Sequence, residues 1–70
     1  MNKLVNYLKE FRFKNCLTQQ ELAAKCNITH PTYIKVEQGK ETSVRTLQKI
    51  ANGLGVNYKY VVNLYNKEEN

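Results

Sequence analysis

Signals that begin or end a helix recur so closely along this chain that only short helices fit between them. Thr18 is followed three residues later by Glu21, the pattern of a capping box. Three further side chains that cap helix N-termini well follow along the chain: Thr29, Ser43 and Asn57. Gly39 and Gly55 are placed to end helices in a left-handed conformation. The sequence therefore predicts an all-α domain of five short helices.

Apolar residues repeat at helical spacing inside these segments. Leu4, Leu8 and Phe11 fall on one face of a helix. A second stripe consists of Leu47, Ile50, Ala51 and Leu54. The expected helices cover roughly residues 2–14, 19–25, 30–38, 44–54 and 58–65. We expect one domain over residues 1–65 and a polar tail over residues 66–70 that frays.

The charge of the chain favours an anionic partner. The chain holds 11 Lys and Arg against 6 Asp and Glu, a net charge of +5, and residues 1–40 hold seven of the basic and three of the acidic side chains. This asymmetry is typical of nucleic-acid binding, with ordinary solubility charge as the alternative. No apolar run is long enough for a membrane span or a signal peptide, so we expect a cytoplasmic protein without membrane contact.

Cysteine and histidine are too few for a metal centre. Cys16, Cys26 and His30 offer three candidate ligands, whereas a structural zinc site takes about four. We therefore expect no metal and no cofactor, and we expect Cys26 to be a small buried apolar residue. The chain also lacks a glycine-rich phosphate loop and an acidic pair suited to a cleft. We expect neither enzymatic activity nor a small-molecule substrate.

The second and third expected helices are joined by a break of three residues, Asn27, Ile28 and Thr29. Two short helices joined so tightly cross steeply, as in a helix-turn-helix. The positions expected to face the core are Leu22, Ala23, Cys26, Ile28, Tyr33 and Val36. The positions left facing outward are His30, Pro31, Thr32, Ile34 and Lys35.

Several short motifs at set intervals resemble the phage-repressor and Cro type of helix-turn-helix domain, the XRE family. They are Thr18–Ala23, Ile28-Thr29, Val36–Lys40, Leu47, Ile50-Ala51 and Leu54–Val56. The resemblance covers about residues 4–64. It implies a lambda-repressor-like fold whose second short helix enters the major groove of double-stranded DNA.

The resemblance also implies roles for single residues. The base-reading positions are His30, Pro31, Thr32 and Lys35. The positions implied to contact phosphates are Gln19, Gln38 and Lys40, with Thr42 and Arg45 as further candidates. Alternatives remain open: His30 as a solvated surface residue, Gln19 as a helix former, and Lys35 as surface charge or a phosphate contact.

Arg12 and Glu37 match a structural ion pair of the family that fastens the first helix to the recognition helix. An exposed, weak pair is the alternative.

Two departures from the family affect the loops. Thr42 stands where a proline is usual, in a loop one residue shorter, and Asn15 replaces a glycine, so we expect Asn15 to take the left-handed conformation.

Tyrosines gather near the end of the chain. We expect Val56, Tyr58 and Val61 to contribute to the core. The residues expected to form a dimer surface are Tyr58, Tyr60, Val62 and Tyr65. A solvated, tyrosine-rich end is the alternative.

The leading functional hypothesis is a homodimeric transcriptional regulator, a repressor that occludes a promoter by binding a palindromic operator. The alternative is a protein-interaction module that keeps the fold, such as an antitoxin or another regulator that binds a protein partner.

Overall fold

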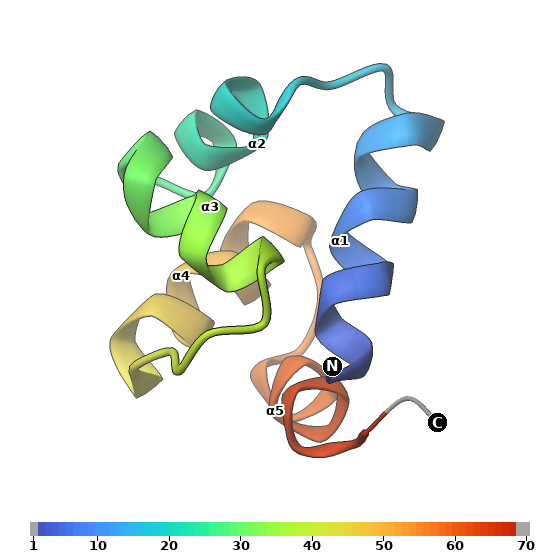
Figure 1. Cartoon of the computed structure of the whole chain (residues 1–70), viewed down its shortest axis with the longest axis vertical. Coiled ribbons are helices and arrows are strands. Elements are labelled where there is room, and N and C mark those ends of the chain that lie inside the picture. Colours follow the sequence, from blue (N-terminus) through green and yellow to red (C-terminus); the bar gives the residue numbers. More distant parts are fainter. Residues whose placement is uncertain (1, 69–70) are drawn as a thin grey trace.

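The computed structural model describes residues 2–68 and shows five helices around one core (Figure 1). They are α1 (Lys3–Lys14), α2 (Gln19–Lys25), α3 (His30–Glu37), α4 (Val44–Leu54) and α5 (Tyr58–Asn66). Within residues 2–68 the extended backbone is limited to an isolated antiparallel bridge between Asn2 and Glu68. The all-α prediction is therefore confirmed. No helix in this part of the chain is long and apolar enough to cross a membrane.

Side-chain caps begin the helices at the positions that the sequence indicates. The Thr18 hydroxyl accepts from the Glu21 N–H at 3.1 Å, and the Glu21 carboxylate accepts from the Thr18 N–H at 2.9 Å. Hydrogen bonds from the Thr18 backbone and side chain hold the pKa of Glu21 below its ordinary value. The other expected caps also accept backbone N–H groups: Thr29, Ser43 and Asn57. Local chemistry alone thus sets where α2 to α5 begin.

The core is formed by one face of every helix. Its largest fully buried side chains include Leu4 and Leu8 of α1, Leu22 of α2, Tyr33 of α3, Ile50 of α4 and Val61 of α5. Cys26 lies at the end of α2 and is buried, as expected, and burial raises the pKa of its thiol to about 11. Ile28, Val56 and Tyr58 are partly buried and pack against this core. The buried faces of α2 and α3 fix how the two helices cross.

The turn between α1 and α2 differs from the expectation. Cys16 takes the left-handed conformation with φ of 55°, whereas Asn15 has φ of −105°. Asn15 caps α1, and both its N–H and its side-chain amide donate to the Phe11 carbonyl, at 3.1 and 2.8 Å. These two bonds hold Asn15 at the helix end, so the change of direction occurs one residue later.

The end of the chain forms contacts that the sequence did not predict. α5 continues to Asn66, the Lys3 N–H donates to the Lys67 carbonyl at 2.9 Å, and Glu68 forms the bridge to Asn2. The fraying of residues 66–68 stays a prediction. Residues 69 and 70 of the expected tail lie outside the described residues.

Candidate nucleic-acid interface

α2, the turn after it and α3 form a tight unit at the surface of the molecule (Figure 1). Asn27 takes the left-handed conformation with φ of 58° and its N–H donates to the Ala24 carbonyl, while the Ile28 N–H donates to the Ala23 carbonyl. This turn changes the direction of the chain between α2 and α3, which pack on each other. Tyr33 and Val36 bury the inner face of α3, so the outer face is left for another molecule.

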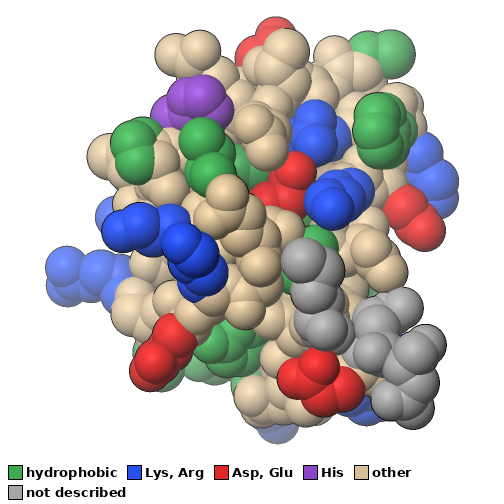
Figure 2. All heavy atoms as spheres, viewed as in Figure 1, with side chains coloured by type: hydrophobic (Ala, Val, Ile, Leu, Met, Phe, Trp, Pro, Cys, Tyr) green, Lys and Arg blue, Asp and Glu red, His purple; other side chains and the backbone are tan. Residues whose placement is uncertain are grey.

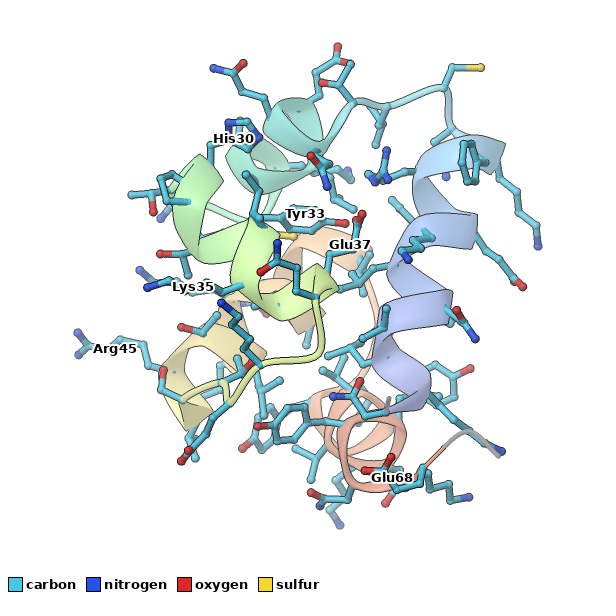
Figure 3. The ribbon with its side chains drawn as sticks, in the orientation of Figure 1. His30, Tyr33, Lys35, Glu37, Arg45 and Glu68 are labelled. Carbon is cyan, nitrogen blue, oxygen red and sulfur yellow. The ribbon has the colours of Figure 1, made fainter. Side chains whose placement is uncertain are left out.

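The outer face of α3 carries apolar, hydroxyl and basic side chains together. Pro31 and Lys35 are exposed, and His30, Thr32 and Ile34 are partly exposed. Lys35 extends outward from α3 (Figure 3). Figure 2 shows the histidine beside apolar side chains, with lysine and arginine side chains below them. No segment of residues 2–68 covers this face completely, which is the condition for its entry into a groove.

His30 lies at the first position of α3, and its ring is turned partly inward. Its Nε2 atom is buried and has no hydrogen-bond partner within residues 2–68. A buried polar atom without a partner is unfavourable.

The inner end of α3 is tied to α1 and α2 through Glu37, which is 5% exposed. Arg12 donates to both carboxylate oxygens at 2.9 Å, from Nε to Oε2 and from Nη2 to Oε1. Gln19 Nε2 donates to Oε1 at 3.0 Å, and the Tyr33 hydroxyl donates to Oε2. We call these four residues the glutamate network. Arg12 and Glu37 thus form a bidentate and largely buried ion pair.

The hydrogen bonds of the glutamate network lower the pKa of the Glu37 carboxyl group. Burial alone would raise the pKa of Glu37, but the hydrogen bonds from Arg12, Tyr33 and Gln19 outweigh burial and lower it. Burial, and then the neighbouring carboxylate, raises the pKa of Tyr33, so its hydroxyl stays a donor. Sequence reasoning found Arg12 and Glu37 but missed the parts that Tyr33 and Gln19 play in this network.

The comparison with known families agrees with this geometry. A family model described as "Helix-turn-helix" matches residues 8–61, which include the whole of α2, α3 and α4. The chain belongs to the XRE-type helix-turn-helix family. At the family level it is a DNA-binding transcription regulator, and its family is not one of enzymes. The comparison with curated proteins gave no match.

The phosphate positions that the helix-turn-helix resemblance implies differ in how open they are. Gln38, Lys40 and Arg45 are exposed. Gln19 is partly buried and commits one amide hydrogen to Glu37. Thr42 is also engaged internally, because its N–H donates to the Tyr65 hydroxyl at 2.8 Å and its hydroxyl donates to the Lys40 carbonyl at 3.1 Å. The roles of all five residues stay predictions.

The α5 side chains expected at a dimer surface are unequally exposed. Tyr60 is 46% exposed and its ring meets that of Tyr7 edge-on, with centroids 5.6 Å apart. Tyr58, Val62 and Tyr65 are partly buried against the core. The expected surface is therefore centred on Tyr60.

Two exposed apolar side chains escaped the sequence reasoning. Phe13 is 75% exposed, with the Arg12 guanidinium 5.6 Å from its ring centroid, and Val44 is 60% exposed. Phe13 does not lie on the helix face that carries Leu4, Leu8 and Phe11. This spacing was the sequence signal that could have identified Phe13 as exposed. Within the described residues, no group of three or more His, Cys, Asp or Glu side chains could hold a metal ion.

Proposed function

We propose that this helix-turn-helix protein binds a specific double-stranded DNA site through α3 and represses transcription by occluding a promoter. The observation that carries the proposal is the outer face of α3, which is open while its inner face is buried by Tyr33 and Val36 and its end is held by the glutamate network. A rigid helix with one free face fits the major groove, which admits an α-helix.

The side chains divide into base readers and phosphate contacts. In this proposal Lys35 donates to guanine acceptors, Thr32 and His30 contact neighbouring base edges, and Pro31 touches a thymine methyl group. The phosphate contacts are Gln19, Gln38, Lys40, Thr42 and Arg45. Lys35, Gln38, Lys40 and Arg45 are all exposed, which both roles require.

The proposed active form is a homodimer on a palindromic operator. The exposed Tyr60 ring, backed by Tyr7, supports a contact between two copies through α5. Two copies related by a twofold axis place their recognition helices about one DNA turn, ~34 Å, apart.

Two lysine variants test the division of roles. Lys35→Ala is expected to relax base preference at one position of the site, at a cost of about 1–3 kcal/mol of discrimination. Lys40→Ala is expected to weaken binding to all duplexes alike and to reduce the slope of log affinity against log salt by about one. Lys3→Ala, at the start of α1, serves as the matched charge control. Identical behaviour of the Lys35 and Lys40 variants would contradict the division.

The second candidate function is a protein-interaction module, which the exposed Tyr60 and Phe13 rings favour. Salt titration separates the two candidates, because binding driven by phosphate contacts weakens steeply as salt rises. An interaction module is expected to show little affinity for a duplex at any salt concentration.

A further inference from the structure

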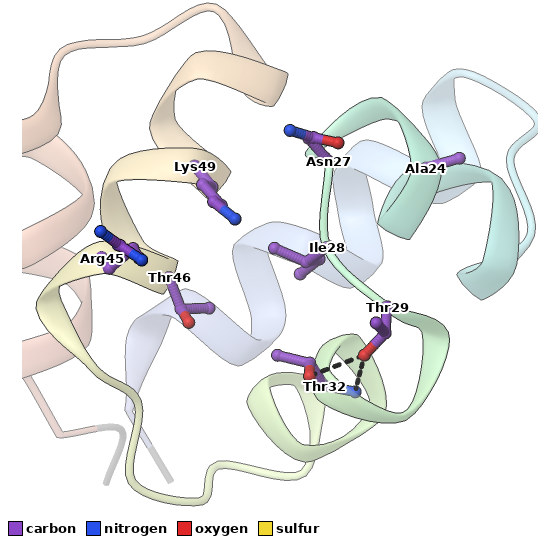
Figure 4. A pocket seen from close by; sticks show the side chains of 8 residues that line it. All are labelled: Ala24, Asn27, Ile28, Thr29, Thr32, Arg45, Thr46 and Lys49. Carbon is purple, nitrogen blue, oxygen red and sulfur yellow. Dashed lines mark hydrogen bonds between the residues drawn. The ribbon is translucent and has the colours of Figure 1, made fainter.

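The loop between α3 and α4 has no apolar side chain to anchor it in the core. Its residues, 38–43, are all polar or glycine, and most of them are exposed. Figure 4 shows this loop running from the end of α3 to the start of α4, where Arg45 and Thr46 lie. Without a buried apolar side chain, the loop depends on hydrogen bonds for its position.

Three hydrogen bonds connect the last turn of α3 to α5 through this loop. The Lys40 N–H donates to the Lys35 carbonyl at 3.1 Å, and the Thr42 hydroxyl donates to the Lys40 carbonyl at 3.1 Å. The Thr42 N–H donates to the Tyr65 hydroxyl oxygen at 2.8 Å, across 23 positions of the chain. We call these three bonds the loop relay. It joins Lys35 and Lys40, which the proposed function places at the DNA, to a residue of α5.

Tyr65 is well suited to anchor the far end of the loop relay. Its ring is partly buried against the core, and α5 packs on both α1 and α4. A ring packed in this way has already lost its freedom of rotation, so the hydrogen bond costs little further side-chain entropy. Thr42 offers a backbone N–H, which a proline at this position would lack. The bond therefore depends on the identities of both residues.

We propose that Tyr65 is a positioning residue for DNA binding, whose hydroxyl holds the α3–α4 loop and so sets the position of Lys40. This inference rests on the proposed function, in which Lys40 contacts the duplex. Tyr65 itself acts from α5, through Thr42. Without the Tyr65 hydroxyl, Thr42 loses its acceptor and the loop is no longer tied to α5. Binding then has to order the loop, which lowers affinity.

Tyr65→Phe removes the hydroxyl and keeps the ring, so it breaks the loop relay with little change in packing. Hydrogen exchange of the Thr42 amide is expected to become about twofold to tenfold faster, because its N–H loses its acceptor. Duplex affinity is expected to fall by a similar factor, about twofold to tenfold. Both quantities are measured well below the melting temperature of each protein, so that every variant is folded.

Two double variants separate positioning from a general loss of stability. In a Lys40→Ala background, Tyr65→Phe is expected to have little further effect on duplex affinity, because the side chain that it positions is absent. In a Thr42→Pro background, which lacks the donor N–H, Tyr65→Phe is expected to have no further effect. General destabilisation, or a contact of the Tyr65 hydroxyl with a second copy, would weaken binding by the same factor in every background.

The proposal is overturned if Tyr65→Phe leaves Thr42 exchange or duplex affinity unchanged, or weakens binding equally in all backgrounds. A wild-type protein that binds no duplex at any salt concentration would contradict the proposed function instead. In that case faster exchange of the Thr42 amide in Tyr65→Phe still supports the hold of Tyr65 on the loop, and an unchanged rate overturns it.

Discussion

Each carboxylate oxygen of Glu37 accepts two hydrogen bonds, one from Arg12 and one from either Gln19 or Tyr33. A carboxylate has about four acceptor sites, so this buried charge is fully satisfied. Its partners come from α1, α2 and α3 itself, so this side chain adds polar contacts between the recognition helix and two other helices to the packing of the buried Tyr33 and Val36. Glu37 is therefore expected to affect both the stability of the fold and the position of the recognition helix.

Removing this side chain is expected to destabilise the fold. Glu37→Ala leaves the Arg12 side chain, which is 15% exposed, without its counter-ion and the buried Tyr33 hydroxyl without its acceptor. Breaking one partner of such a pair costs about 3–5 kcal/mol. In a domain of this size each kcal/mol lowers the melting temperature by about 4–8 °C. Glu10→Ala, at an exposed site on α1, is the control, and an unchanged melting curve for Glu37→Ala would contradict the prediction.

The same residue predicts how stability depends on pH. The pKa of Glu37 is lowered in the folded protein, below the ordinary value of 4.5. Its contribution is therefore complete above about pH 4.5 and is lost as pH falls through the folded pKa. Urea unfolding from pH 7 to pH 3 should show a decline that is shallower in Glu37→Gln. Some decline persists, because the pKa of Glu21 is also lowered. An identical decline in both proteins would count against this role.

At the scale of helices, the capping residues allowed the start of each of α2 to α5 to be predicted. Thr18, Thr29, Ser43 and Asn57 act within three residues of themselves, so their effect is readable from local sequence. Cys16 takes the left-handed conformation expected of Asn15, because two hydrogen bonds from Asn15 to the Phe11 carbonyl hold Asn15 at the end of α1.

Contacts between residues far apart in the chain were the part that local sequence could not predict. Gln19 binds Glu37, and the Tyr65 hydroxyl accepts from Thr42, across 18 and 23 positions. The first alters an expected phosphate contact, and the second fixes the loop before α4. Such pairs depend on how the helices pack, which no spacing rule encodes. The residue roles toward DNA were given by family resemblance and stay predictions.

The packing of α4 on α2 predicts an unusual response to a helix-favouring substitution. A Cβ at Gly53 would lie 2.4 Å from Cys26 Sγ and 2.7 Å from Cys26 Cα. Gly→Ala normally stabilises a helix by about 1 kcal/mol. Gly53→Ala is instead expected to lower the free energy of unfolding by about 1–3 kcal/mol, because backbone must move.

Asn52→Ala, at the neighbouring exposed position of α4, is the matched control and is expected to be neutral or slightly stabilising. Urea denaturation of both variants measures the difference. A Gly53→Ala protein as stable as the wild type would show that the two helices have room to separate.

As a whole molecule, the protein is a body of 27 × 23 × 21 Å in which the helix-turn-helix and α5 lie apart (Figure 1). α2 and α3 are at one end, and α5 lies beside the start of α1 at the other (Figure 1). Residues 1–40 carry most of the net charge of +5. This arrangement leaves α3 free for a groove while α5 is free to contact a second copy.

Selection of binding sites from random duplex DNA tests the central claim most directly, because it reports affinity, base preference and symmetry together. If α3 reads DNA, we expect enrichment of one sequence with twofold symmetry, whose half-sites are centred about one helical turn, ~34 Å, apart. With Lys35→Ala, enrichment should fall at one position of each half-site. Recovery of duplexes without a common sequence, or of none above background, would contradict the claim that α3 reads DNA.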